Sequence, residues 1–456
     1  MWRPKELNTD KTLYIAIADA IELDIKRGYL KPDDKMPPQR HIAEVIGVNL
    51  TTITRAYNLA KKRGMLTAVT GKGTFVANEK EYLLPRISSG EDEVIDLGLV
   101  GTLNIEHKEI SKIISDISRY SNLSLLLDYV PSNGLLEHRQ MGKVWIKSHG
   151  YDVDPDDVVI CAGAMHAINC CLTSLFTQGD KIAADSLTFA GFINSCSTNN
   201  MKLEGVEMDD EGMIPESLEL LCLKQDIKGV YLMPNLQNPT ATTMSLERKK
   251  KISEVIRKYD LLLIEDDVYN LFDESVKPIS SFIPEHSIFI SGTSKNLYAG
   301  LRIAYAVVPQ KYHKRFVQTV TTTIWMAPPM SCEIVSQLIK RGIATDLISQ
   351  KKKIINDRLS ITKRILKDYD VQGVENSQFA WLKLPSHLNA LEFEHLALLN
   401  KVRVIASSKF SISHGLVPNA VRISFANVST NELLIKGLEK LVEILESPGL
   451  NTPNIM

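Results

Sequence analysis

Apolar and polar residues alternate with the period of an α-helix near the start of the chain. Apolar residues recur at helical spacing from residue 11 to residue 27, and Gly28 then ends the pattern. Two shorter helices are predicted at Gln39–Ile46 and Leu50–Lys62, with Gly47 in the tight turn between them. This arrangement is typical of a helix-turn-helix, whose second helix enters the major groove of DNA.

A β-hairpin is predicted directly after these helices. Two β-prone runs in LTAVTGKGTFV flank Gly71-Lys72-Gly73, which would place the Lys72 cation at the tip of the hairpin, within reach of a phosphate backbone. Residues 78–93 then combine charged residues, a proline and Ser-Ser-Gly, a composition typical of a linker. We therefore predict a DNA-binding domain at residues 1–77 and a linker at residues 78–93.

From Val94 onward the pattern changes to short apolar runs that alternate with helical segments. The runs have the sequences VVICAG, DKIAAD, GVYLMP, LLLIED, SIFI and IAYAVV, and a helix is predicted from Ala164 to about Phe176. Such alternation predicts an α/β domain with a mainly parallel sheet covered by helices. We place this domain at residues 94–446, followed by a tail at residues 447–456.

Composition and charge argue against a membrane or secreted protein and indicate a polyanionic partner for the first domain. No apolar run approaches the ~20 residues needed to span a bilayer, and the N-terminus has no apolar segment of the secretory type, so a cytoplasmic protein is expected. The six cysteines form no C-x-x-C pair, so neither disulfides nor a metal site are predicted. The overall net charge of -1 conceals an asymmetry, because residues 1–77 hold 13 Lys and Arg against 8 Asp and Glu. This excess favours a polyanionic partner for the first domain.

Candidate ligand-binding residues follow several of the predicted strands, at the edge where open α/β sheets bind ligands. Gly163-Ala164-Met165 opens a helix, whose free N–H groups would bind a phosphate, although this segment alone is more typical of an ordinary strand-to-helix turn. Phe189 offers a flat plate for an aromatic ring, although phenylalanine in a loop is more often core packing. Asn238, in the run NPTA, is able to donate to a phenolate oxygen, although Asn-Pro also begins ordinary turns.

An acidic run and a lysine complete this set. Glu265-Asp266-Asp267 follows the apolar run LLLI, where a buried acid needs a partner such as a protonated pyridine nitrogen. Lys295 lies in SGTSKNLYAGLR, and Arg302, seven residues later, would bind a phosphate through two parallel hydrogen bonds. A lysine considered alone is more often a solvated surface residue.

Two of these segments resemble known families. The pattern S-K-x-L-x-x-G-L-R around Lys295 resembles the Schiff-base segment of fold-type I pyridoxal 5'-phosphate (PLP) enzymes, and residues 94–446 resemble the aminotransferases of that fold type. The segment MPPQRHIAEVIGVNLTTITRAY, followed by G-x-G-T-F-V, resembles the winged-helix DNA-binding domain of GntR-type regulators. Together they resemble the MocR subgroup of GntR-type transcriptional regulators. This resemblance implies a winged helix-turn-helix joined to a fold-type I aminotransferase-like domain.

The resemblance also implies roles for individual residues. Lys295 would carry PLP, and Arg422 in NAVRISFANVS would hold a ligand carboxylate, unless it is a strand arginine that points to solvent. The implied cofactor-binding residues are Gly163, Ala164, Met165, Phe189, Asn238, Asp266, Tyr269, Ser294, Lys295, Arg302 and Tyr129. The implied DNA-binding residues are Arg40, Thr51, Thr52, Arg55 and Lys72.

Some details of the resemblance leave alternatives open. Asp267 competes with Asp266 as the partner of the pyridine nitrogen. Ala241 stands where the family usually has glycine, and Gly292 stands where it often has serine, so that Ser291 or Thr293 would substitute or one phosphate contact would be missing. Tyr129, in DYVPSNGLLEHR, would reach the phosphate of a neighbouring subunit, which implies a homodimer.

The resemblance predicts a DNA-binding transcriptional regulator rather than an enzyme. It would sense an amino compound, or PLP itself, through aldimine exchange at Lys295, and it would bind double-stranded DNA. The alternative is an active PLP-dependent aminotransferase that carries an accessory DNA-binding domain. In a third interpretation, the large domain is only a scaffold for dimerisation.

Overall fold

The structure is a computed structural model of the whole chain. It describes residues 2–4, 12–31, 34–62, 65–69, 73–76, 94–103, 105, 107–120, 123–273, 276–412 and 417–447. The chain divides into two compact units, one of Met1–Glu93 with Asn389–His395 and the other of Val94–Leu388 with Leu396–Met456. The predicted linker at residues 78–93, the hairpin residue Lys72 and residues 448–456 lie outside the described residues.

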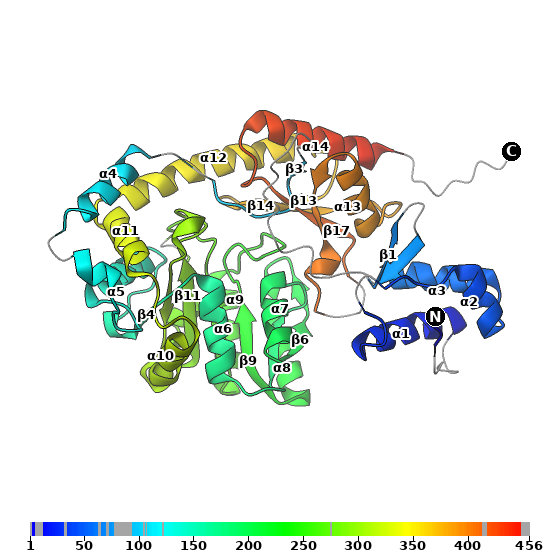
Figure 1. Cartoon of the computed structure of the whole chain (residues 1–456), viewed down its shortest axis with the longest axis horizontal. Helices are drawn as coiled ribbons and strands as arrows, with labels where there is room; N and C mark the ends of the chain where they lie inside the picture. The colour runs from blue at the N-terminus through cyan, green and yellow to red at the C-terminus, as the bar shows by residue number, and fades with distance from the viewer. Residues whose placement is uncertain are drawn as a thin grey trace. The chain divides into compact units, whose positions relative to one another are not determined.

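The described residues between positions 12 and 76 form three helices and a hairpin (Figure 1). The helices are α1 (Leu13–Lys26), α2 (Gln39–Ile46) and α3 (Leu50–Lys62), which confirms the predicted helices, and β1 (Leu66–Val69) pairs antiparallel with β2 (Gly73–Val76). Gly47 ends α2 in the left-handed conformation at φ 74°, which glycine adopts without steric cost. A shared apolar core that includes Ile17, Ile42 and Ile53 fixes the helix-turn-helix.

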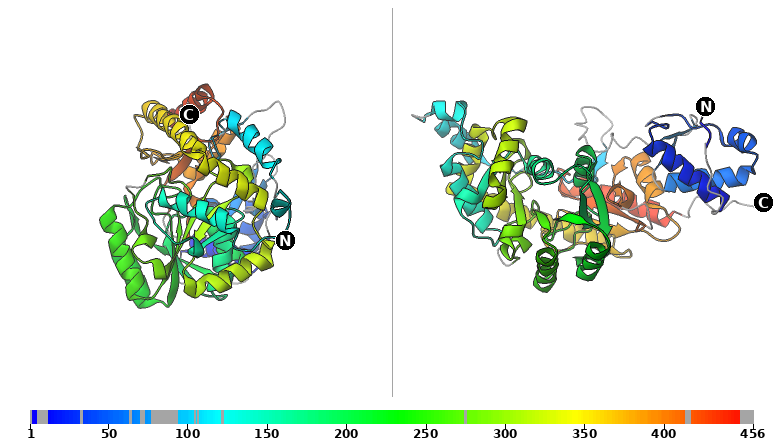
Figure 2. Two further views of the ribbon diagram at one scale, coloured as in Figure 1. Left: turned by 90° about the vertical axis from the view of Figure 1, so that its left-hand side faces the viewer. Right: turned by 90° about the horizontal axis from the view of Figure 1, so that it is seen from below.

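A seven-stranded sheet forms the centre of the second unit (Figures 1 and 2). Its strands, in spatial order, are β4 (Val158–Cys161), β12 (Ala304–Val307), β11 (Ser287–Gly292), β10 (Leu262–Asp266), β9 (Ile227–Leu232), β5 (Lys181–Asp185) and β6 (Lys202–Val206). Only β12 runs antiparallel to its neighbours, and the remaining pairs are parallel, so the predicted mainly parallel sheet is confirmed. The sequence did not reveal β6, because KLEGV is not an apolar run.

Helices cover both faces of this sheet. One apolar core lies between the sheet and α6 (Ala164–Leu175), α7 (Ala190–Thr198) and α10 (Gln310–Ile324). A second core lies between the opposite face and α8 (Pro215–Lys224) and α9 (Leu246–Lys258). Strand β10 serves both cores, because Ile264 belongs to the first and Leu263 to the second. Its successive side chains therefore point to opposite faces.

A smaller antiparallel sheet contains β13 (Val371–Gln372), β14 (Phe379–Lys383), β17 (Ala420–Ser424) and β16 (Ile405–Ala406), in this spatial order. The long helix α12 (Ile343–Ile365) packs at one end against α11 (Pro329–Lys340) and elsewhere against α14 (Asn431–Glu446) (Figure 1). It therefore connects the helices beside the large sheet with those beside the small one.

The remaining α-helices have 10 to 12 residues and the remaining strands have two. They are β3 (Ile95–Asp96), which pairs parallel with β15 (Val402–Arg403), β7 (Met208–Asp209), β8 (Gly212–Met213), α4 (Lys108–Ile117), α5 (Leu136–Lys147) and α13 (Ala390–Leu399). Within the described ranges, no helix combines the length and the apolar character that crossing a membrane requires.

Candidate functional site

A cradle for an anion forms where β4 meets α6. Gly163 begins α6 at φ 89°, and a Cβ atom on it would lie 2.3 Å from the Arg302 guanidinium, so the close approach of Arg302 requires glycine. Arg302 is exposed and its Nη1 donates to Ser294 Oγ at 3.1 Å. The first turn of α6, at Ala164 and Met165, adds N–H groups without intrahelical partners. These donors and the guanidinium charge suit a phosphate group.

Asp266 is the buried acid of the site. It ends β10, and the Tyr231 hydroxyl of the adjacent strand β9 donates to its Oδ2 at 2.8 Å. The other oxygen, Oδ1, is buried and finds no hydrogen-bond partner among the described residues. Burial raises the pKa of Asp266 to about 7. A buried carboxylate oxygen without a partner is costly, and a protonated ring nitrogen would satisfy it.

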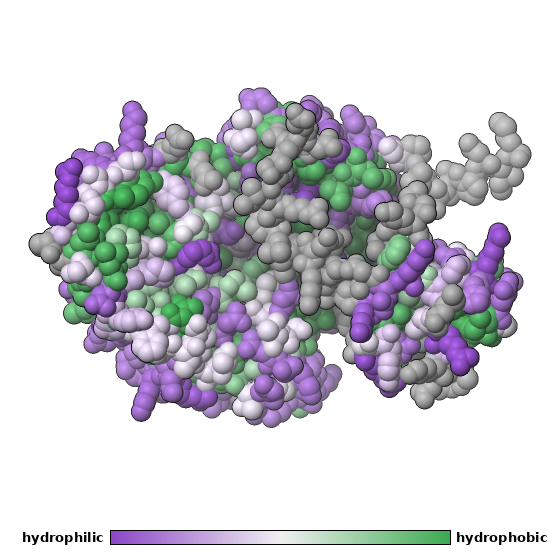
Figure 3. Space-filling view, viewed as in Figure 1, coloured by the Kyte–Doolittle hydropathy of each residue, from purple (hydrophilic) through white to green (hydrophobic). Residues whose placement is uncertain are grey.

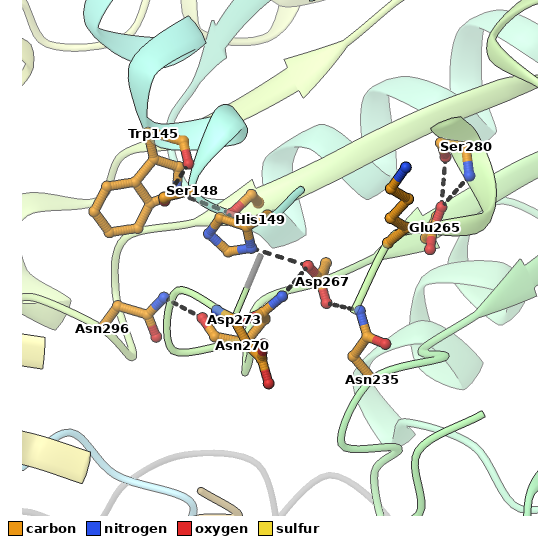
Figure 4. A network of polar contacts seen from close by, with 12 residues as sticks. Trp145, Ser148, His149, Asn235, Glu265, Asp267, Asn270, Asp273, Ser280 and Asn296 are labelled. Carbon is orange, nitrogen blue, oxygen red and sulfur yellow. Dashed lines mark hydrogen bonds and ion pairs between the residues drawn. The ribbon is translucent and has the colours of Figure 1, made fainter. Parts of the chain in front are cut away.

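Asp267 has a different environment (Figure 4). Its Oδ2 lies 2.9 Å from His149 Nδ1 and accepts from Asn270 at 3.1 Å, while its Oδ1 accepts from Asn235 at 2.9 Å. Both oxygens therefore have partners. Of the two candidates for a ring nitrogen, this geometry favours Asp266.

Glu265 is also fully engaged, on the opposite face from Asp266. Its Oε2 accepts from the Ser280 backbone N–H at 2.7 Å and from the Ser280 hydroxyl at 2.6 Å, and its Oε1 accepts from the Ile279 N–H at 2.9 Å. The strand alternation thus separates Glu265, whose two oxygens both have partners, from Asp266, whose Oδ1 has no partner among the described residues.

Arg422 lies in a buried cluster with Asn238 and Tyr269. Its Nη1 donates to Asn238 Oδ1 at 2.7 Å and its Nη2 donates to Gly98 O at 2.6 Å, while Nε has no partner among the described residues. Asn238 Nδ2 is 3.4 Å from the Tyr269 hydroxyl. The interpretation of Arg422 as a strand residue that points to solvent is wrong, since only 7% of it is exposed. Burial lowers the pKa of Arg422 to about 10.

Lys295 follows β11 and is half-buried. Its Nζ donates to the backbone carbonyl of Val100. No sequence motif marks Val100, so the sequence did not predict this contact. Burial, reinforced by the charges of Arg422 and Arg302, lowers the pKa of Lys295 to about 8. About one amine in ten is then neutral at pH 7, far more than for an ordinary lysine, and the neutral amine is the nucleophilic form.

The hydroxyls of Ser291 and Thr293, near Lys295, already have hydrogen-bond partners within the chain. Ser291 Oγ accepts from Trp145 Nε1 at 2.9 Å and lies 3.2 Å from His149 Nε2, and Thr293 Oγ1 donates to Ile303 O at 2.9 Å. Neither hydroxyl is free to replace the serine that Gly292 lacks. The sequence left two alternatives, a substitute hydroxyl from Ser291 or Thr293 or the loss of one phosphate contact. This geometry favours the loss of the contact.

Two predicted cofactor residues lie at the ends of other elements. Phe189 precedes α7 and is half-buried, with its ring so close to Gly191 that a Cβ atom there would lie 2.4 Å from it. Tyr129 is 72% exposed, and its ring centroid is 5.5 Å from that of Trp325. Tyr129 therefore projects from the surface of its own chain.

The predicted DNA-binding residues lie on the helix-turn-helix. Arg40 on α2 and Thr51 and Arg55 on α3 are exposed, and Thr52 is half-buried. A residue that the sequence analysis missed is Thr54, whose hydroxyl donates to Gln39 Oε1 at 2.8 Å and so joins α3 to α2. Lys72 lies outside the described residues.

Comparisons with known proteins give the family. Residues 101–437 match the family described as aminotransferase class I and II, and residues 13–76 match the bacterial regulatory proteins of the gntR family. The HTH-type transcriptional regulator YdeF of Bacillus subtilis is 30% identical over 449 residues, which are 98% of this chain and 97% of that protein. The chain belongs to the GntR-type regulators that carry an aminotransferase class I and II domain. The resemblance to the MocR subgroup is thereby confirmed.

Solved structures agree for the larger domain of this GntR-type regulator. An archaeal alanine:glyoxylate aminotransferase superposes with a TM-score of 0.71 and 25% identity, covering 78% of this chain and 91% of that one. LysN, the α-aminoadipate aminotransferase of Thermus thermophilus, superposes with a TM-score of 0.71 and 22% identity over 77% of this chain and 92% of its own. LysN was solved with N-(5'-phosphopyridoxyl)-L-leucine.

The cofactor of this aminotransferase class is PLP, and the residues of the regulator fit it. The Gly163 cradle with Arg302 suits its phosphate, the free Asp266 Oδ1 suits its ring nitrogen, and Lys295 supplies a primary amine of lowered pKa. The neighbouring acids Glu265 and Asp267 already have hydrogen-bond partners. Asp266 Oδ1 is the buried acid oxygen without a described partner, and the pyridine nitrogen would need such an acceptor.

Proposed function

We propose that this protein is a PLP-dependent transcriptional regulator. Its helix-turn-helix binds double-stranded DNA, and its Lys295 site senses an amino compound or the supply of PLP. The observation that carries this proposal is the presence, in one chain, of a GntR-type domain and of a half-buried lysine whose pKa is lowered to about 8. The DNA partner implies a cytoplasmic protein.

The residues of the site have distinct roles in this proposal. When bound, PLP supplies an aldehyde that condenses with a primary amine, forming a C=N bond and releasing one water, and a pyridine ring that withdraws electrons. Lys295 provides the amine, and Asp266 holds a proton at the ring nitrogen. Asn238 and Tyr269 orient the ring oxygen, and Arg302 with Ser294 and the start of α6 binds the phosphate. Phe189 covers the ring.

Arg422 is the proposed site for an effector carboxylate. Its Nε is a buried donor without a partner among the described residues, and its other nitrogens bind Asn238 and Gly98. A carboxylate would satisfy Nε and compete with those weaker, neutral acceptors. An effector with both an amine and a carboxylate, such as an amino acid, would therefore engage Lys295 and Arg422 together.

A homodimer is part of the proposal. Leu127, Tyr129 and Trp325 are 70%, 72% and 55% exposed, and hydrophobic residues gather on the face that carries α4, α5 and α11 (Figure 3). Exposed apolar surface of this kind is typical of a protein interface. A second copy would cover it and would bring Tyr129 of each chain toward the phosphate site of the other.

An active aminotransferase is the second candidate. The likeness to an alanine:glyoxylate aminotransferase over 78% of the chain, together with the full set of Asn238, Asp266, Lys295 and Arg422, supports it. Steady turnover of an amino donor and a 2-oxo acid would favour the enzyme. A half-reaction that stops after one equivalent would favour the regulator.

The proposal is tested by absorption spectroscopy of the purified full-length chain with added PLP. The wild-type chain should show the visible band of covalently bound cofactor, and a panel of amines and amino acids should change this band. Lys295→Ala should lack the band, while Lys353→Met, at an exposed position, should keep it. A band that persists in Lys295→Ala would overturn the assignment of the lysine.

A further inference from the structure

Helix α12 carries two buried cations on one face. Lys351 is 1% exposed and Arg358 is 3% exposed, and their spacing of seven residues places them two turns apart on the same side of the helix. Buried lysine and arginine side chains are rare unless their charges are satisfied by specific partners. Here the partners are mainly backbone carbonyl oxygens, which indicates that each cation fixes a nearby loop.

Lys351 fixes the turn that contains the site lysine. Its Nζ donates to Leu297 O at 2.6 Å and lies 3.4 Å from Lys295 O, and it lies 5.8 Å from the centroid of the Tyr298 ring. The carbonyl of Lys295 itself is therefore one of the oxygens that this ammonium group holds. Any movement of the Lys295 turn has to alter the contacts of Lys351.

Arg358 fixes the loop that follows β17, the strand that carries Arg422. Its Nη1 donates to Phe425 O at 2.7 Å and to Val428 O at 2.9 Å, and its Nη2 donates to Ser429 O at 3.4 Å. Its Nε donates to Asn431 Oδ1 at 3.2 Å, at the start of α14. One guanidinium group thus joins α12 to the small sheet and to α14.

We propose that Lys351 and Arg358 are positioning residues through which α12 couples the Lys295 turn to the segment that follows Arg422. The coupling rests on the proposed function, in which Lys295 holds the cofactor. Because α12 is a continuous helix of 23 residues, a displacement at Lys351 is transmitted to Arg358 two turns away. The state of the cofactor lysine would then affect the strand that holds the effector carboxylate.

The charge of Lys295 provides the trigger for this coupling. Burial, and then repulsion from Lys295, lowers the pKa of Lys351 to about 7. An imine nitrogen is less basic than an amine, so covalent attachment of the cofactor at Lys295 would reduce this repulsion and favour the protonated form of Lys351, which donates to Leu297 O and Lys295 O. Release of Lys295 restores an amine that takes up a proton, and the contacts of Lys351 with the turn then weaken.

Hydrogen–deuterium exchange of the full-length chain, with and without PLP, tests the coupling. In the wild-type chain, PLP should slow exchange in residues 295–301 and also in residues 420–430, by about tenfold or more in each, because the charged hydrogen bonds are secured. In Lys351→Met, PLP should still slow exchange in residues 295–301, whereas residues 420–430 should change by less than about twofold. Lys353→Met, an exposed lysine on the same helix, is the matched control and should behave as the wild type.

A second variant tests the other end of α12. Arg358→Lys keeps the positive charge but loses the fork that reaches three carbonyl groups, so the response of residues 420–430 should again be lost. The inference is overturned if residues 420–430 respond to PLP in both variants as they do in the wild type while the cofactor band is present. Absence of that band in the wild-type chain would instead overturn the proposed function, and this inference with it.

Discussion

The Tyr231 hydroxyl donates to Asp266 Oδ2 at 2.8 Å, between the adjacent strands β9 and β10. Tyr231 also stacks on Phe192, with ring centroids 3.7 Å apart. Stacking on Phe192 fixes the position of the Tyr231 ring, and the Tyr231 hydroxyl fixes the orientation of the Asp266 carboxylate. This contact leaves Asp266 Oδ1 as the oxygen that is free to meet a ring nitrogen.

Tyr231→Phe should weaken the binding of PLP by about tenfold, because it keeps the stack but removes a hydrogen bond to a buried carboxylate, worth ~1–3 kcal/mol. Affinity is measured by titration of the cofactor-free chain and by following the visible band. Tyr259→Phe, a half-buried tyrosine that follows α9, is the control. Equal affinities of the wild type and Tyr231→Phe would show that Tyr231 does not support Asp266.

Asp266→Asn and Asp267→Asn should change the stability of the cofactor-free protein in opposite directions at pH 8. The pKa of Asp266 is raised to about 7 in the folded chain, so its charged form disfavours folding, and this penalty grows as the pH rises from the unfolded-state pKa through 7. Asp266→Asn removes the penalty and should stabilise. Asp267 binds His149, Asn235 and Asn270 through its two oxygens, and Asp267→Asn replaces one of these acceptors with an amide donor. This variant should destabilise the protein by ~1–3 kcal/mol.

Urea denaturation at pH 5 and pH 8 measures both effects. The stabilisation by Asp266→Asn should be smaller at pH 5, because the wild-type carboxyl is then largely protonated in the folded chain. If Asp267→Asn stabilises and Asp266→Asn destabilises, the two assignments are reversed.

The rate at which PLP attaches to the cofactor-free chain should rise with pH and level off above about pH 8. Attachment requires the neutral amine of Lys295, and burial lowers its pKa to about 8. Stopped-flow absorption between pH 6 and pH 10 would give the profile, with a short lysine peptide as the reference. A profile that continues to rise to the ordinary pKa of lysine would contradict the environment described for Lys295.

Arg55→Ala should weaken binding to double-stranded DNA by ~1–3 kcal/mol while it leaves the cofactor band unchanged. Arg55 is exposed on α3, the second helix of the helix-turn-helix. Fluorescence anisotropy at several salt concentrations measures the loss, and Asn58→Ala, at an exposed position on the same helix, is the control. A simultaneous loss of the band would contradict a division of the chain into separate DNA-binding and cofactor-binding domains.

Local patterns predicted much of the fold and many of the candidate residues. The helices at 39–46 and 50–62 were readable because glycine and apolar periodicity mark them. Lys295 and Arg302 were readable because their spacing matches a family pattern. The contact of Arg422 with Asn238 was not readable, since 184 residues separate them in the chain.

The choice between Asp266 and Asp267 also required the fold. It depends on His149, which is 118 residues from Asp267, and on Tyr231, which is 35 residues from Asp266. Lys351 resembles any other lysine in a helix until its partners on the Lys295 turn are known. Burial and distant partners, rather than local composition, therefore decide these roles.

The proposed regulator requires that the Lys295 site control DNA binding. This control is measured by the affinity of the full-length chain for a duplex that the chain itself selects from random sequences. Affinity is compared for the cofactor-free protein, the protein with PLP, and the protein with PLP and a panel of amino acids and amines. We predict a difference of about fivefold or more between at least two of these states in the wild type, and none in Lys295→Ala. Equal affinity of the wild-type chain in all of these states would show that the Lys295 site does not control DNA binding.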